Sequence, residues 1–128
     1  MNIPHLPFAF VSDVPSYDTA EVFFVHLDPD ICQTDELLRA LYYGLWLPGY
    51  FGFNWDALYD SLCDLAWIPQ KKLVILHAKL PSLPEADSKI YLEVLRDAVQ
   101  NLAVSGQHVL EVIFPESDRS EIERLLAS

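Results

Sequence analysis

The sequence predicts an α/β domain in which a three-stranded parallel sheet is flanked by about four helices. Short runs rich in β-branched and aromatic residues alternate with longer segments of helical periodicity. This alternation favours parallel strands joined by right-handed crossovers. The length of 128 residues and the hydrophobic content of 52% fit one domain with a proper core. The predicted strands are residues 21–27, 72–77 and 108–114.

The first twenty residues differ from the rest because prolines interrupt them. They contain one short apolar segment, residues 8–11, which is either an added edge strand or an arm packed on the body. We therefore divide the chain into an N-terminal extension, residues 1–20, and one domain, residues 21–128. The first predicted strand of that domain is so apolar that we expect it to be buried on both faces.

Two helices are expected between the first two strands. One opens at Thr34, with acidic residues in its first turn, and Pro48 ends any continuation of it. The other has a good N-cap in Asn54 and is stopped by Pro69. Its inner face carries apolar residues at helical spacing, namely Leu58, Leu62 and Leu65.

Two more helices follow. A long one is expected over residues 85–104, with Gly106 just past its end. After the third strand, Asp118 or Ser120 caps a final helix that runs through Leu126.

The charge balance narrows the choice of partner. The formal net charge is −11, with only 8 Lys and Arg residues. Nucleic acid and anionic membrane surfaces are therefore poor partners, because both require a basic patch. A basic protein would be attracted, although many small acidic domains carry such a charge for solubility alone. No apolar run is long enough to span a bilayer.

The cysteines and the N-terminus point to the cytoplasm. Cys32 and Cys63 form neither a disulfide framework nor a CxxC pair, and two free thiols suit a reducing compartment. The first residues contain no basic region and are broken by prolines, so they do not resemble a signal peptide.

Three acids stand out on the predicted second helix. Asp56, Asp60 and Asp64 are spaced four residues apart and share one helical face. Residues 40–70 contain no Lys or Arg. Like charges at this spacing cost a helix about 0.2–0.5 kcal/mol per pair. Folding gains little from this arrangement, whereas a surface that meets a positively charged partner gains much, so we interpret it as a recognition surface.

Enzyme and metal chemistry find less support. Asp56 and Asp60 could act as a general acid and base, but catalytic carboxylate pairs usually face a cleft from different elements. No nucleophile motif and no glycine-rich phosphate loop occurs. The four histidines stand in no metal-ligand spacing, so we expect satisfied or partly exposed histidines. We expect no enzyme activity, no metal and no cofactor.

Aromatic residues crowd the same region, and more than half of them lie between positions 42 and 67. We expect Phe51, Trp55 and Trp67 to fill the core. Tyr50, in the loop, and Tyr59, near the acidic face, are expected at the surface, because tyrosine beside acids is typical of interface hot spots.

The loop and helix together resemble a known family signature. Residues 47–62 read Leu-Pro-x-Tyr-Phe-Gly-x-Asn-x-Asp-Ala-Leu-Tyr-Asp-x-Leu, which resembles the signature of the barstar family of intracellular inhibitors of barnase-type ribonucleases. The resemblance covers about residues 21–114, with a weaker match at residues 95–98. It implies the same three-stranded parallel sheet with flanking helices.

The resemblance also implies a protein-binding site. By position, Asp60 would mimic a substrate phosphate, Asp56 would pair with an enzyme Arg, and Tyr50 would pack on the catalytic His. Tyr59 would stand where the family has an interface tryptophan, and Asp97 would form a salt bridge at the rim. The full set of implied partner-binding residues is Tyr50, Gly52, Asn54, Asp56, Tyr59, Asp60 and Asp97.

Four further positions depart from the family pattern. Phe53 replaces an acid, Trp55 replaces a leucine, Leu65 replaces an interface tryptophan, and Asp64 adds an acid. The sequence leaves open whether Phe53 and Trp55 face a partner or the core. The residues implied at the centre of the interface are kept, whereas residues at its rim differ from the family. We therefore expect the target to be a different ribonuclease-like toxin.

The sequence therefore predicts a stoichiometric inhibitor, or immunity protein, of a basic ribonuclease or related toxin. The alternative is an acidic protein-binding or regulatory module of the same fold whose partner is not a nuclease.

Overall fold

The computed structural model describes residues 7–13, 21–49 and 52–127 of the chain. The strands are β1 (Ala9–Val11), β2 (Val22–Leu27), β3 (Lys72–His77) and β4 (Val109–Pro115). The helices are α1 (Thr34–Gly44), α2 (Trp55–Asp64), α3 (Glu85–Ser105) and α4 (Arg119–Ala127), with a single 3-10 turn at Glu116–Asp118 before α4.

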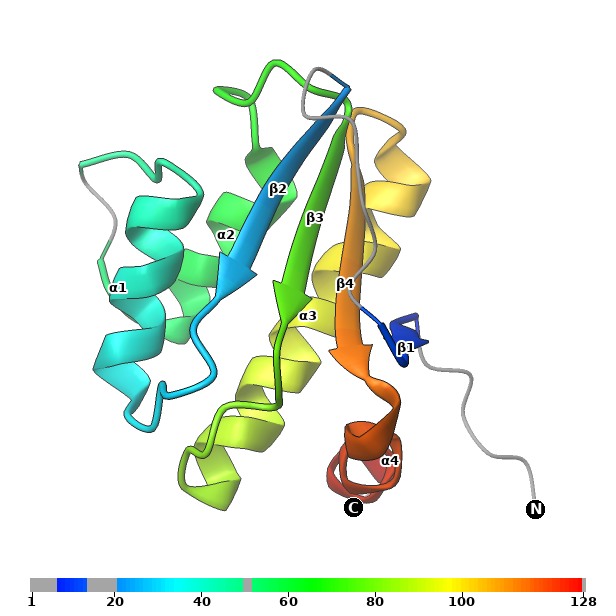
Figure 1. Cartoon of the computed structure of the whole chain (residues 1–128). Coiled ribbons are helices and arrows are strands. Elements are labelled where there is room, and N and C mark those ends of the chain that lie inside the picture. The colour runs from blue at the N-terminus through cyan, green and yellow to red at the C-terminus, as the bar shows by residue number, and fades with distance from the viewer. Residues whose placement is uncertain (1–6, 14–20, 50–51, 128) are drawn as a thin grey trace.

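The strands form one parallel sheet in the order β1-β4-β3-β2 (Figure 1). The α/β class and the parallel sheet are confirmed, but the described chain has four strands where the sequence predicts three. The additional strand is β1, which pairs with the end of β4 so that Ala9 lies opposite Ile113. A strand of three residues is too short to show a periodicity that would distinguish it from a packed arm.

The main core lies on one face of the sheet, where α1, α2 and α3 pack (Figure 1). Leu73 and Ile75 of β3 point into this core and are fully buried. Leu41 of α1, Leu62 of α2 and Leu95 of α3 meet them there, and each has an exposed fraction of 0%. The apolar spacing within each helix thus fixes which side of that helix turns away from solvent.

Strand β2 corrects one prediction. Val25 and Leu27 are buried on the helix-covered side, but His26 is exposed and Phe24 is half-buried. The expectation that this strand is buried on both faces is wrong, because β2 lies at the edge of the sheet. An apolar run does not reveal whether a strand lies at the centre or at the edge.

The helix boundaries follow the local signals with one exception. Helix α1 begins at Thr34, whose hydroxyl donates to Asp87 at 2.9 Å. Gly106 ends α3 in the left-handed region, with φ 73°. Helix α2 ends before the predicted stop at Pro69, because Leu65 adopts the left-handed conformation with φ 53° and its amide donates to Ser61.

The last helix is held at the carboxyl end of the sheet. Asp118, which precedes α4, accepts a hydrogen bond from the backbone amide of Leu80 at 2.7 Å. Arg124 of α4 pairs with Glu85 of α3 at 2.7 Å. These contacts join α4 to the β3–α3 connection. In the described part of the chain, no helix is both long and apolar enough to cross a membrane.

A buried histidine links β3 to the helix layer. His77 is 1% exposed, and its Nδ1 donates to the carbonyl oxygen of Ile113 at 3.1 Å. Its Nε2 is then the acceptor for the hydroxyl of Tyr91, at 2.6 Å. The imidazole stacks on Phe114 with ring centroids 4.1 Å apart. Burial lowers the pKa of His77 from 6.5 to about 3, so the ring is neutral at physiological pH.

The buried histidine predicts acid sensitivity of the fold. The unfolded chain binds a proton at His77 below pH 6.5 and the folded chain does so only near pH 3, so this contribution to stability is lost as the pH falls between these values. Its slope is about 1.4 kcal/mol per pH unit. Chemical denaturation from pH 6 to 4.5 should therefore show a shallower loss of unfolding free energy in His77→Gln than in the wild type. Asn101→Ala, at an exposed position without a titratable group, is the control. Equal slopes for the wild type and His77→Gln would contradict this account.

The start of α2 depends on its cap. Oδ1 of Asn54 accepts from the amide of Ala57 at 2.8 Å. Replacing Asn54 by Ala should lower the free energy of unfolding by about 1 kcal/mol, and Asn54→Asp, which keeps an accepting oxygen, should lose less. Urea denaturation measures this, with Asn101→Ala on the exposed side of α3 as the control. A loss in Asn54→Ala no larger than in Asn101→Ala would contradict the capping role.

Candidate functional site

The acidic face of α2, which we define as Asp56, Asp60 and Asp64, points into solvent. All three side chains are exposed. On the opposite side of the same helix Leu58 and Leu62 are fully buried. A helix packed along one stripe turns the residues between the stripe positions outward, so the core fixes the direction of the carboxylates. The three acids therefore form one exposed line along α2, as their spacing predicts.

In the part of the chain that the structure describes, no ion pair neutralises these carboxylates. The cations that form ion pairs do so elsewhere: Lys72 with Glu111, Arg96 with Asp97, Arg119 with Glu116, and Arg124 with Glu85 and Glu121. The acidic face thus presents a negative electrostatic field to solvent, and this field attracts a positively charged partner.

A fourth acid comes from α3, which packs along α2. Asp97 acts with Asp60 on the hydroxyl of Tyr59. The pKa of Tyr59 is raised first by its hydrogen bond to the Cys63 sulfur and then, more weakly, by these two negative charges. The carboxylate of Asp97 is about half exposed and lies 3.0 Å from Arg96 Nε. The packing of α3 along α2 therefore brings the charge of Asp97 within electrostatic range of Tyr59, although the sequence separates the two residues widely.

The loop before α2 is shaped around the cap. Nδ2 of Asn54 donates to the carbonyl oxygen of Gly52 at 3.3 Å. A Cβ atom at Gly52 would stand 3.0 Å from Nδ2 of Asn54, so any side chain there presses on the cap. Both residues are exposed, as is Phe53 between them. In this loop the Asn54 side chain lies close to the Gly52 backbone, and Gly52, Phe53 and Asn54 are all exposed to solvent.

The structure gathers most of the predicted binding residues. Gly52 and Asn54 lie in the loop, Asp56, Tyr59 and Asp60 on α2, and Asp97 on the adjacent α3. Tyr50 lies outside the described residues, as does Phe51, for which a core position is expected. The contact of each residue with a partner stays a prediction.

The aromatic and apolar residues around α2 differ in how far they are buried. Trp55 is half-buried, and its ring lies 5.9 Å from that of Tyr91, so it faces the core. Trp67 donates from Nε1 to the carbonyl oxygen of Leu45 at 2.8 Å and also packs on the core. The core predictions for these two tryptophans are confirmed. Leu65 is fully buried, whereas Phe53 is 43% exposed.

The sequence interpretation missed two exposed aromatics near this site. Tyr43 is 72% exposed and Trp46 is 71% exposed. Both belong to the aromatic-rich region that the sequence singles out, but neither was assigned a role. Their place beside a helix end gave no periodic signal to separate them from core residues.

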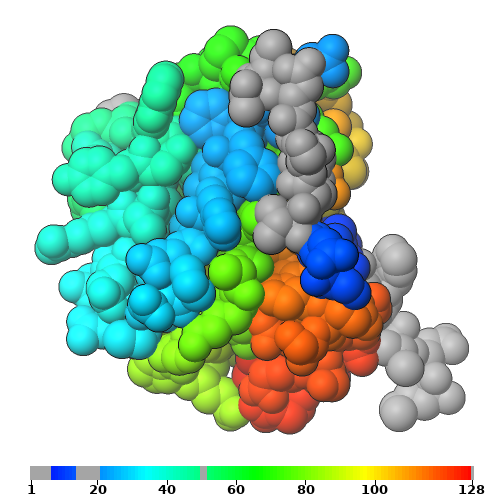
Figure 2. Space-filling model, viewed as in Figure 1, coloured from blue at the N-terminus to red at the C-terminus, as the bar shows by residue number. Residues whose placement is uncertain are grey.

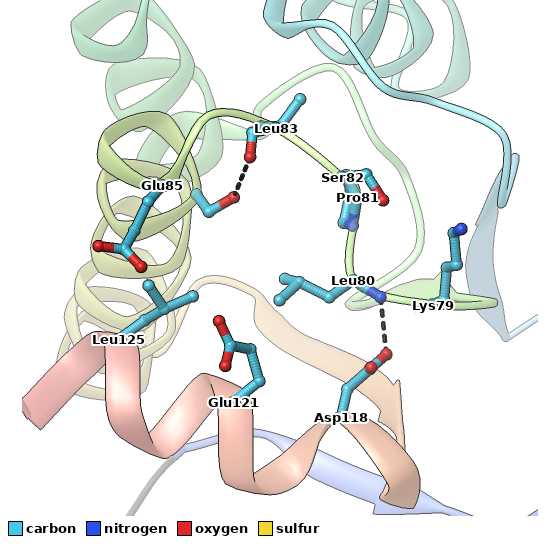
Figure 3. Close-up of a pocket in the computed structure, with 10 residues that line it drawn as sticks. Lys79, Leu80, Pro81, Ser82, Leu83, Glu85, Asp118, Glu121 and Leu125 are labelled. Carbon is cyan, nitrogen blue, oxygen red and sulfur yellow. Dashed lines mark hydrogen bonds between the residues drawn. The ribbon is translucent and has the colours of Figure 1, made fainter.

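A cavity of about 340 Å³ lies between the β3–α3 connection and α4 (Figure 3). It includes no residue of α2. Its polar lining is used internally: Asp118 accepts from Leu80, Glu85 pairs with Arg124, and Ser88 donates to Leu83. We therefore assign its polar groups to the attachment of α4. Among the described residues, no three His, Cys, Asp or Glu side chains are grouped so that they could hold a metal ion.

Comparison with known proteins is consistent with this arrangement. No curated protein matches the chain. The family model described as Barstar (barnase inhibitor) matches residues 22–113, which is well over half of the sequence. This region contains the loop, the acidic face and Asp97, and it excludes β1 and α4. The chain therefore belongs to the barstar family.

Proposed function

We propose that this protein is a stoichiometric inhibitor of a basic ribonuclease or related toxin, that is, an immunity protein that blocks the active site of its target. The observation that carries the proposal is the acidic face of α2, which is exposed and without internal ion pairs in the described chain, in a protein of the barstar family. Family members are described as inhibitors of barnase. We assign no catalysis and no cofactor to the chain.

The proposed mechanism is mimicry of the RNA backbone. A ribonuclease must hold phosphate with positively charged groups, and carboxylates on a rigid helix offer those groups a substitute. In this arrangement Asp60 takes the place of the phosphate and Asp56 pairs with an enzyme Arg. Because Leu58 and Leu62 fix α2 on the core, the backbone that carries these carboxylates is already ordered before binding.

The remaining site residues have supporting roles in the proposal. Gly52 and Asn54 shape the loop, Tyr50 packs on a catalytic side chain, and Tyr59 gives an apolar contact. Asp97 lies at the rim, where its partial exposure and its pairing with Arg96 suit an adjustable contact.

Charge also sets the expected rate of association. A net charge of −11 and the absence of Lys and Arg from residues 40–70 attract a basic enzyme from a distance. Such steering weakens as salt screens the field, with a Debye length of about 10 Å at 0.1 M. We place the encounter in the cytoplasm, where a cell would need protection from a ribonuclease that it makes.

The central test is the loss of a single carboxylate. Asp60→Asn keeps the size of the side chain and removes its charge, and we expect it to weaken binding to a barnase-type ribonuclease by at least about 2 kcal/mol. The upper end of the range for such hot spots, about 8 kcal/mol, comes from the barnase–barstar pair itself. Isothermal titration against barnase and related ribonucleases measures the change.

Glu123→Gln on α4 is the matched control, because it removes the same unit of charge outside the proposed interface. If it weakened binding as much as Asp60→Asn, the effect would be one of net charge and the active-site proposal would fail. Tight binding to a basic protein without nuclease activity, and to no ribonuclease, would favour the regulatory module.

A further inference from the structure

Three large aromatic side chains gather on the surface beside the acidic face. We define the aromatic patch as Tyr43, Trp46 and Phe53, which are 72%, 71% and 43% exposed. Tyr43 belongs to the last turn of α1, and the other two lie in the α1–α2 connection. In Figure 2 the turquoise end of α1 and the segment after it project from the surface beside β2. Exposed aromatic groups of this size are typical of interaction sites.

Two residues of the aromatic patch have left-handed backbones, Trp46 with φ 54° and Phe53 with φ 53°. At Trp46 this conformation ends α1, because the Trp46 amide donates to the carbonyl oxygen of Tyr43 at 3.3 Å and the Leu47 amide donates to that of Tyr42 at 2.9 Å. Glycine is the usual residue at such a helix end, so the turn itself does not require an aromatic side chain. The Trp46 ring contacts Phe23, with ring centroids 5.8 Å apart, and is still 71% exposed. A large ring left in solvent at this point suits a contact surface.

The patch contains a groove with aromatic walls. A volume of about 240 Å³ is lined by Asp35, Arg39, Tyr43 and Phe53. The one acid and the one base balance each other, so the groove offers no net charge to an ion. Tyr42 supports both walls, since its ring centroid lies 5.1 Å from that of Tyr43 and 5.0 Å from that of Phe53. This chemistry suits an apolar or aromatic side chain.

The patch adjoins the acidic face along the chain. Phe53 directly precedes Asn54, the N-cap of α2, and Asp56 lies in the first turn of that helix. A partner that covers Asp56 therefore comes close to Phe53, which is one wall of the groove. Tyrosine and tryptophan next to charged residues are typical of the hot spots that dominate binding energy at protein interfaces.

We propose that the aromatic patch is a second part of the partner interface and that its groove takes an apolar side chain from the rim of the basic ribonuclease's cleft. This inference rests on the proposed function and narrows it to enzymes that carry such a side chain next to their active site.

Charge favours the ribonuclease over a second copy of this chain as the occupant. Two copies meeting at the patch would bring two acidic faces together in molecules that each carry a net charge of −11. Like charges across an interface oppose association, whereas a basic enzyme is attracted by the acids next to the patch.

The test compares four variants, Tyr43→Ala, Trp46→Ala, Asp60→Asn and Val104→Ala, by titration of barnase and a panel of barnase-type ribonucleases at low and moderate salt. Tyr43→Ala should raise the Kd about tenfold, the scale of an interface anchor, and leave the salt dependence unchanged. Asp60→Asn should raise the Kd and flatten the salt dependence. Val104→Ala, at a side chain 90% exposed near the end of α3, should stay within about twofold of the wild type. Thermal melting checks that each variant is folded.

The outcomes separate the two proposals. If Tyr43→Ala and Trp46→Ala both bind like Val104→Ala while Asp60→Asn binds weakly, the patch inference is overturned and the inhibitor proposal stands. If the wild type binds none of the ribonucleases, both are overturned. If sedimentation shows a wild-type dimer that Tyr43→Ala dissociates, with ribonuclease affinity unchanged, a second copy covers the patch and the inference is overturned.

Discussion

The one-sided packing of α2 is the constraint on which the proposed site depends. Leu58 and Leu62 are fully buried against the sheet and α3, and Leu65 ends the helix in a buried left-handed turn. A helix anchored in this way has one orientation, which turns Asp56, Asp60 and Asp64 outward together. The same packing sets α3 alongside, so Asp97 joins the surface. The burial of apolar side chains in the core thus determines where the carboxylates lie on the surface.

Beneath α2 the core contains a polar contact that supports the start of the helix. The ring of Trp55, the first residue of α2, leans on Tyr91, and the Tyr91 hydroxyl donates to His77 of β3. Both nitrogens of the His77 ring are used, so the group is satisfied as long as it is neutral. Burial disfavours the charged form of His77, which lowers its pKa to about 3. Tyr91 thus connects the first residue of α2 to a buried, uncharged histidine of β3.

The sequence predicted the elements more reliably than their surroundings. Strands β3 and β4 and helices α1 and α3 lie where apolar runs, acidic first turns and Gly106 place them, because these signals are local. The edge position of β2, the pairing of β1 and the early end of α2 at Leu65 depend on contacts between distant segments, which periodicity does not encode. The acidic face was predictable because it lies within one helix. The approach of Asp97 to Tyr59 was accessible only through the family resemblance, and the exposure of Tyr43 and Trp46 had no sequence signal at all.

The measurement that tests the inhibitor proposal most directly is the rate of RNA cleavage by barnase and related ribonucleases as this protein is added. If the loop and α2 occupy the active site, the rate of at least one enzyme should fall linearly and reach zero at one inhibitor per enzyme, with RNA competing for the free enzyme. Full cleavage by every enzyme at several-fold excess of this protein would contradict the proposal, although the barstar fold would remain.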